Sequence, residues 1–229
     1  MNRPTVSVVI PVLNGSRWLA HQLEALKLES AQPFETIIAD NGSTDDSVAI
    51  AKRFGREMTL RVVDASERRG QAFARNLGAR AATGDSILFL DQDDQIEPGY
   101  VTLMTSALID AELVAARMDD KKLNDGWRSK ARTLPQTSGL PLDPVPWAYG
   151  CTLGVRRTTF ERLGGFAEDL GTFAAEDVDF CWRAHERGVV LTFVGDAVLH
   201  YRYPTTLRGF FRQGSAYGFA ALRRRPRRT

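Results

Sequence analysis

The chain has 229 residues, of which 43% are hydrophobic and 25% charged, and a net charge of +2. This composition is typical of a globular protein with one large α/β domain or two small ones. The sequence contains no run of about 18 apolar residues, so no membrane-spanning helix is expected. Because five arginines crowd into the last seven residues, the rest of the chain is slightly acidic, which argues against general nucleic-acid binding.

The two cysteines, Cys151 and Cys181, stand outside any Cys-x-x-Cys pair, so a zinc site is not expected. The N-terminal residues lead directly into a strand-like run and leave no room for a signal peptide. These features predict a cytoplasmic protein with reduced thiols, which could also lie at the inner face of a membrane.

Strands and helices alternate through the first half of the sequence. β-branched and apolar runs predict strands over 6–10, 34–39, 60–63 and 87–90, the first ended by Pro11. Helical spacing predicts helices over 18–26, 48–52 and 71–82 between them. This βαβαβαβ pattern predicts an α/β fold, with a mainly parallel sheet covered by helices on both faces.

The second half is less regular. Its patterns predict a helix over 98–111, a strand over 113–117, a long polar loop over 119–143 and a strand over 148–155. A short helix ending at Gly164, a helix over 174–188 and strands over 189–194 and 197–201 follow. Helical spacing in 207–222 predicts a last, amphipathic helix before the arginines.

Polar residues follow the predicted strands where each strand ends. They are Asn14, Asp40, Asp64 and Asp91. The carboxyl ends of parallel strands meet at one edge of the sheet, where such sheets bind ligands. Asp91 and Asp93 point the same way from an extended segment, and carboxylates of this kind bind Mg²⁺ or Mn²⁺. A solvated acidic turn is the alternative.

A second acidic cluster, Glu176, Asp177 and Asp179, begins the predicted helix over 174–188. One of these carboxylates could take the proton of an acceptor hydroxyl. The alternative is that they only stabilise the helix dipole. His200 follows a strand-like run and could complete a metal site with carboxylates, although a lone histidine is more often structural.

Together these segments resemble the family 2 glycosyltransferases of the GT-A fold. The resemblance rests on the strand and loop at 8–14, the base-binding segment 38–45, the Gly-x-x-x-Ala-Arg-Asn-x-Gly segment 70–78, the Asp-x-Asp strand 89–93 and the Glu-Asp pair 176–177. Asn41 departs from the pattern, because aspartate is commoner there. The Gln-x-x-Arg-Trp motif of processive members is absent, which indicates transfer of a single sugar, and the general look resembles bacterial rhamnosyl- or mannosyltransferases.

The resemblance implies an inverting transfer from a UDP-, GDP- or dTDP-sugar to an acceptor hydroxyl, with Mn²⁺ or Mg²⁺. Asp177 would act as the base and Glu176 would orient the acceptor or a loop. The metal would be held by Asp91, Asp93 and His200. The nucleotide sugar would be bound by Pro11, Val12, Asn14, Asp40, Arg75, Asn76 and Asp91.

We expect one GT-A domain over 1–204, with a Rossmann-like nucleotide-sugar half (1–97) and an irregular acceptor half (98–204), followed by the helix and basic tail over 205–229. The tail could be solvated, contact an anionic membrane or contribute to a homodimer. A sugar-nucleotide nucleotidyltransferase is a second hypothesis, weakened because 11–17 contain a single glycine. A binding module of the same fold without catalysis is a third.

Overall fold

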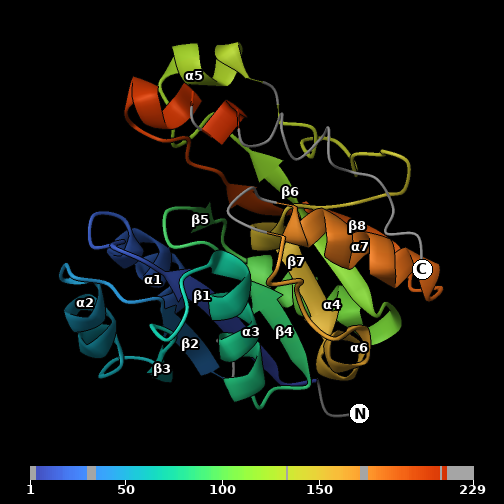
Figure 1. Ribbon diagram of the computed structural model, residues 1–229, viewed down its shortest axis with the longest axis horizontal. Helices are drawn as coiled ribbons and strands as arrows, with labels where there is room; N and C mark the ends of the chain where they lie inside the picture. The colour runs from blue at the N-terminus through green and yellow to red at the C-terminus, as the bar shows by residue number, and fades with distance from the viewer. Residues whose placement is uncertain (1–3, 30–34, 133, 171–174, 212, 216–229) are drawn as a thin grey trace.

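The computed structural model describes residues 4–29, 35–132, 134–170, 175–211 and 213–215. In its first half strands and helices alternate, as the sequence predicts (Figure 1). They are β1 (Val6–Val12), α1 (Leu19–Lys27), β2 (Glu35–Asp40), α2 (Ser47–Phe54), β3 (Leu60–Asp64), α3 (Gln71–Ala81) and β4 (Ser86–Phe89).

The second half contains shorter and more varied elements. They are β5 (Gln95–Ile96), α4 (Tyr100–Asp110), β6 (Leu113–Asp119), α5 (Gly126–Ala131), a 3-10 turn (Gly150–Thr152), β7 (Leu153–Arg156), α6 (Arg157–Leu163), α7 (Glu176–Glu186) and β8 (Leu191–His200). Residues 207–211 and 213–215 are also helical, whereas 216–229 lie outside the described residues. No helix among the described residues is long and apolar enough to cross a membrane.

The described strands form one eight-stranded sheet in the order β3-β2-β1-β4-β7-β6-β8-β5. The strands β3, β2, β1 and β4 run parallel to one another. The strand β7 is antiparallel to both β4 and β6, whereas β8 is parallel to β6 and antiparallel to β5. The carboxyl ends of the first four strands therefore meet at one edge, where ligands bind in sheets of this type.

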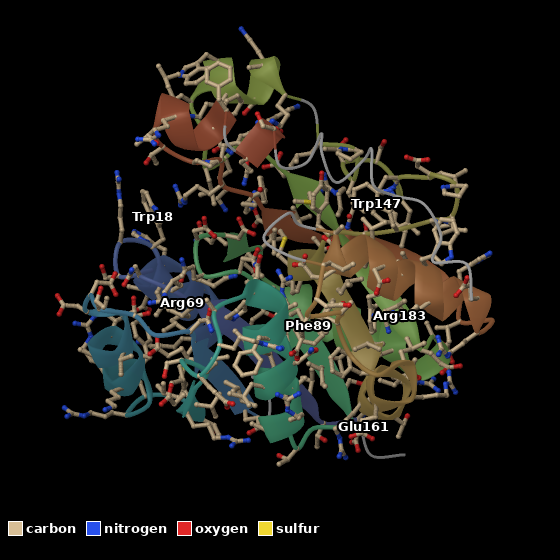
Figure 2. All side chains as sticks on the ribbon, viewed as in Figure 1. Trp18, Arg69, Phe89, Trp147, Glu161 and Arg183 are labelled. Carbon is tan, nitrogen blue, oxygen red and sulfur yellow. The ribbon has the colours of Figure 1, made fainter. Side chains whose placement is uncertain are left out.

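Helices cover both faces of the sheet, and β1 shows how the sequence directs this. Its successive side chains alternate between faces. Val8 and Ile10 are fully buried in a core with α1, α2 and α4, while Val9 is fully buried in a second core with α3, α6 and α7. In the second core Phe89, labelled in Figure 2, packs its ring 5.4 Å from that of Phe160. The predicted α/β fold with helices on both faces is confirmed.

The prediction that Pro11 ends the first strand is wrong, since β1 continues to Val12. The Val9 carbonyl accepts from Leu90 on the β4 side, and the Val12 carbonyl accepts from Asn41 on the β2 side. Alternation therefore turns the backbone of Pro11 towards β4, whose pairing with β1 ends at Val9. Proline is tolerated there because no partner strand requires its missing N–H.

Three predictions for the second half need correction. The strands over 189–194 and 197–201 are one strand, β8, which passes through Gly195 with a register shift opposite Ala116 and Arg117. The predicted loop over 119–143 contains α5. The predicted strand over 148–155 begins only at Leu153, because the residues just before it form the 3-10 turn.

Candidate active site

Arg75 links the two halves of the chain. It lies on α3, is 2% exposed, and donates hydrogen bonds to Asp91 Oδ1 at 2.8 Å and to Glu176 Oε1 at 3.0 Å. Burial disfavours the charged guanidinium, but these two carboxylates outweigh burial and raise the pKa of Arg75 above its ordinary value. The end of β4 is thus joined to the start of α7 by a buried cation.

Asp177 lies beside this ion pair. Its Oδ2 accepts a hydrogen bond from the Gly150 N–H at 3.1 Å, and its Oδ1 accepts one from the Val178 N–H at 2.8 Å. Burial, followed by the nearby charge of Glu176, raises the pKa of Asp177 to about 6. Gly150 is required by packing, because a Cβ there would lie 2.6 Å from Arg75 Nη1. Asp177 is therefore a carboxylate held in place, with a pKa suited to accepting a proton near neutral pH.

Three aspartates follow β4 in different surroundings. Asp91 Oδ1 also accepts from Gln71 Nε2 at 2.8 Å. Among the described residues no other residue donates a hydrogen bond to the Asp93 carboxylate, and burial and the charge of Asp91 raise the pKa of Asp93 to about 6. Asp94 is 2% exposed, and its Oδ1 accepts from the Arg202 N–H at 2.9 Å. Burial raises the pKa of Asp94 well above its ordinary value, and Asp93 and Asp91 add to this.

These carboxylates fit a hard divalent cation. Arg75 compensates the charge of Asp91, whereas burial and the charge of Asp91 outweigh the charge of Arg202 at the half-buried Asp93, whose pKa is raised. Oxygen ligands of this kind suit Mg²⁺ and Mn²⁺. In addition Asp91, Asp94 and Cys151 each place one ligand-type atom within 4.8 Å of the others.

The structure places His200 in a different set of contacts. Its Nδ1 lies 2.9 Å from Asp119 Oδ2, and its Nε2 lies 2.5 Å from Glu97 Oε1 and 3.2 Å from Lys122 Nζ. Both ring nitrogens are engaged here, and among the described residues the group of potential ligand atoms is Asp91, Asp94 and Cys151, without His200. Its role as a metal ligand stays a prediction and would require the Glu97 contact to be exchanged.

The predicted nucleotide-binding residues of the first two loops hold these loops together. Asn14, whose φ is +51°, accepts from the Thr44 N–H at 2.8 Å and donates from its backbone to Ser43 Oγ at 3.0 Å. Asp40 Oδ1 accepts from the Ser43 N–H at 3.0 Å. Pro11 and Val12 are buried in β1 beside these loops. A role in nucleotide binding stays a prediction for all four.

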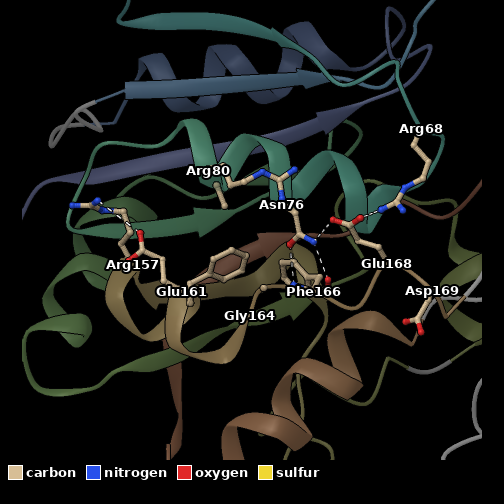
Figure 3. Close-up of a pocket in the computed structure, with 12 residues that line it drawn as sticks. Arg68, Asn76, Arg80, Arg157, Glu161, Gly164, Phe166, Glu168 and Asp169 are labelled. Carbon is tan, nitrogen blue, oxygen red and sulfur yellow. Dashed lines mark hydrogen bonds and ion pairs between the residues drawn. The ribbon is translucent and has the colours of Figure 1, made fainter.

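Asn76, also predicted to bind the nucleotide sugar, contacts the segment after α6. Its amide donates to the Phe166 carbonyl at 2.8 Å and to Glu168 Oε1 at 2.7 Å, and it accepts from the Phe166 N–H. This segment, α3 and α6 border a cavity of about 680 Å³ (Figure 3). None of Asp91, Asp93 and Asp177 lines that cavity, so the cavity and the carboxylate cluster are separate places.

Gln92 was not predicted from the sequence. Its side-chain amide exchanges two hydrogen bonds with the backbone of Leu13, at 2.9 and 3.2 Å. A Cβ at Gly15 would lie 2.4 Å from the Gln92 side-chain oxygen, so a larger residue there would displace the Gln92 side chain. The middle residue of the Asp-x-Asp segment therefore fastens it to the first loop.

Arg202 joins the end of β8 to the same edge. Its guanidinium carbon lies 3.9 Å from the centre of the Trp18 ring, and its Nε donates to the Asp93 carbonyl at 2.8 Å. Figure 2 shows Trp18 at the rim of the nucleotide half, facing the part of the chain that contains α5. Nothing in the spacing of residues along the sequence predicts this contact.

Comparison with known proteins identifies the family. A sequence model described as glycosyl transferase family 2 matches residues 7–166. The chain belongs to glycosyl transferase family 2. Among its relatives, the pre-mycofactocin glycosyltransferase of Mycobacterium tuberculosis is 29% identical over 94% of this chain and 46% of its own length. The validoxylamine A glucosyltransferase of Streptomyces hygroscopicus is 27% identical over 82% of this chain and 49% of its own length.

Solved structures support the GT-A fold. The mannosyltransferase PcManGT from Pyrobaculum calidifontis, solved with GDP-Man and Mn²⁺, superposes with a TM-score of 0.71 at 23% identity, over 90% of this chain and 59% of its own. S. aureus TarS, solved in complex with UDP-GlcNAc, superposes with a TM-score of 0.70 at 22% identity, over 87% of this chain and 59% of its own. The chain spans about half the length of the curated relatives it matches. Rhamnosyl or mannosyl specificity is not confirmed by these likenesses.

Proposed function

We propose that this family 2 glycosyltransferase moves one sugar from a nucleoside-diphosphate sugar to an acceptor hydroxyl, with inversion at the anomeric carbon. The observation that carries the proposal is the buried Arg75, bonded to Asp91 at 2.8 Å and to Glu176 at 3.0 Å. It unites the carboxylates that follow β4, expected on the donor side, with those that begin α7, expected on the acceptor side.

Asp177 is the proposed general base. The N–H groups of Gly150 and Val178 hold its carboxylate by hydrogen bonds. The carboxylate of Glu176, in contrast, is already paired with Arg75. A carboxylate with a pKa of about 6 is largely ionised at neutral pH and can still accept the proton of an attacking hydroxyl. Glu176, held by Arg75, positions the start of α7 and through it Asp177.

We also propose that Asp91 and Asp93 hold a divalent cation, with Asp94 behind them. When bound, a cation such as Mn²⁺ neutralises charge on the leaving nucleoside diphosphate. The donor set fits, since Asp93 is half-buried and no other described residue donates a hydrogen bond to its carboxylate. The proteins solved with UDP or GDP sugars and Mn²⁺ support this assignment by analogy of fold alone.

The alternatives differ in what they need from the chain. A nucleotidyltransferase would bind a triphosphate through a glycine-rich first loop, but the loop here has a single glycine, Gly15, and the Gln92 side chain packs against it. A binding module without catalysis would not need the Asp177 carboxylate. Release of nucleoside diphosphate from a bound donor distinguishes both from a transferase.

The test begins with a thermal-shift screen of UDP-, GDP- and dTDP-sugars with and without Mn²⁺, since a ligand that binds only the folded state raises its melting temperature. The donor that stabilises the protein is then incubated with enzyme and a panel of hydroxyl-bearing acceptors, and free nucleoside diphosphate is measured. We expect one nucleotide to stand out and its sugar to be transferred to an acceptor hydroxyl, or slowly to water, as the nucleoside diphosphate leaves. Cleavage to a nucleoside monophosphate, or binding without any release across the panel, would contradict the proposal.

A further inference from the structure

A basic lobe stands apart from the carboxylate cluster. It comprises residues 121–132, which include α5, and residues 202–211 and 213–215. Figure 1 shows α5 and the helical residues 207–211 and 213–215 side by side, away from most of the sheet. Arg132 ties them together, donating to the Phe210 carbonyl and to Gln213 Oε1, each at 2.8 Å. The two segments therefore form one surface.

The basic lobe presents large apolar side chains to solvent. Trp127 is 43% exposed, Leu207 60% and Phe211 67%. Leu207 and Phe211 are four residues apart on a helix and so share a face. Phe210 is buried beneath them, with its ring 5.5 Å from Trp127 and 6.1 Å from Phe211. Two of the three exposed side chains, Trp127 and Phe211, therefore pack against the buried ring of Phe210.

Positive charge surrounds these apolar side chains. The described residues include five lysines and arginines in 121–132 and two in 202–211 and 213–215, against one acidic residue, Asp125. Asp125 is already paired with Arg128. Lys130 and Arg208 are exposed on the same two segments. Apolar side chains next to excess positive charge are complementary to a partner surface that combines apolar groups with negative charge.

We propose that the basic lobe docks on an anionic lipid bilayer, with Leu207, Phe211 and Trp127 entering the headgroup region and Lys130 and Arg208 facing lipid phosphates. Helices with one apolar side and one basic side bind at this interface. A second copy of the chain placed symmetrically on this surface would bring its own positive charges against it. The sequence after 215 continues with Tyr217, Phe219, Leu222 and five arginines, the same combination of side chains.

Co-sedimentation with vesicles tests this proposal. The full chain is mixed with vesicles of phosphatidylglycerol and phosphatidylcholine in equal parts, or of phosphatidylcholine alone. We expect binding to the anionic vesicles only, weakened by salt. The double variants Leu207→Ser/Phe211→Ser and Lys130→Glu/Arg208→Glu should each bind at least about tenfold more weakly.

The matched control is Leu28→Ser/Val190→Ser, since both side chains are 75% exposed on other parts of the molecule. It should bind vesicles like the unmodified chain. Thermal unfolding and nucleotide binding should be unchanged in all three variants, which separates docking from folding. The proposal is overturned if the unmodified chain ignores anionic vesicles, or if the lobe variants bind like the control. It is also overturned if light scattering shows a dimer of the unmodified chain and a monomer of Leu207→Ser/Phe211→Ser. The same holds if RNA, added at the same total phosphate charge as the anionic vesicles, displaces the protein from them.

Discussion

Arg75 donates a hydrogen bond to Glu176 at 3.0 Å, although 101 residues separate them in the sequence. Both residues are buried, and the same guanidinium binds Asp91. A buried arginine and the carboxylates that pair with it are stable only while the set is complete. This arrangement makes Arg75 the residue on which the geometry of the site depends.

Replacing Arg75 by alanine should destabilise the fold strongly. The change leaves the buried Glu176 and the partly buried Asp91 without their cation, a loss that costs about 3–5 kcal/mol. Arg80 lies on the same helix and is exposed, so Arg80→Ala should change stability by no more than about 0.5 kcal/mol. Urea unfolding of both variants measures the difference. Equal stabilities would show that the buried ion pair does not hold the site.

Asn41→Asp should also destabilise this chain, even though aspartate is commoner there in the family. Asn41 is 4% exposed, and its amide donates to the carbonyls of Ala65 at 2.5 Å and Arg68 at 2.8 Å. An aspartate cannot make these bonds when ionised, and unmet buried groups cost about 1–3 kcal/mol. Urea unfolding should show this loss for Asn41→Asp and almost none for Glu67→Gln in the exposed loop that follows β3.

The pKa of Asp177 predicts a change of stability with pH. Burial raises this pKa from 3.8 to about 6 in the folded state, so the folded chain holds the proton more tightly than the unfolded chain. Asp177 therefore costs stability as the pH rises from about 4 to about 6, and Asp177→Asn lacks this cost. Unfolding experiments below and above this window should show the variant gaining on the unmodified chain. A difference that does not vary with pH would contradict the burial of this charge.

Binding of the nucleoside diphosphate should depend on a cation. With Mn²⁺ present, Asp93→Asn should weaken calorimetric binding of the nucleotide by at least about tenfold, since changes around metal ligands cost 10–100-fold. Asp196→Asn, an exposed carboxylate on β8, is the control and should bind like the unmodified chain. Tight binding in excess chelator would count against the metal role of Asp91 and Asp93.

Periodicity was sufficient for residues 1–97, the expected nucleotide half, because the strands there are continuous and apolar. Val8 and Val9 alternate between two cores, and each βαβ unit is local in sequence, so the first four strands could be predicted. In the acceptor half, α5 has six residues and none is buried, so no apolar pattern marks it. The strand β8 was divided in two because Gly195 and Asp196 interrupt its apolar run, although the backbone continues as a strand.

Long-range side-chain partners are the part of the site that the sequence could not supply. The types of Asp91, Asp93, Glu176 and Asp177 indicated carboxylate chemistry, and the resemblance added their roles. The contacts of His200 with Asp119 and Glu97 bridge 81 and 103 residues, and no spacing rule indicates them. The same holds for Gln92 with Leu13, which depends on how two loops meet at the sheet edge.

The central claim is that Asp177 removes the proton from the attacking hydroxyl. Its most direct test compares Asp177→Asn with Asp179→Asn, a carboxylate on the same helix that pairs with Arg183 at 2.7 Å. Donor binding by calorimetry and release of nucleoside diphosphate are measured for both. We expect Asp177→Asn to bind the donor nearly as well as the unmodified chain and to release product about 10²–10⁴-fold more slowly. Turnover by Asp177→Asn at the rate of the unmodified chain would contradict the claim.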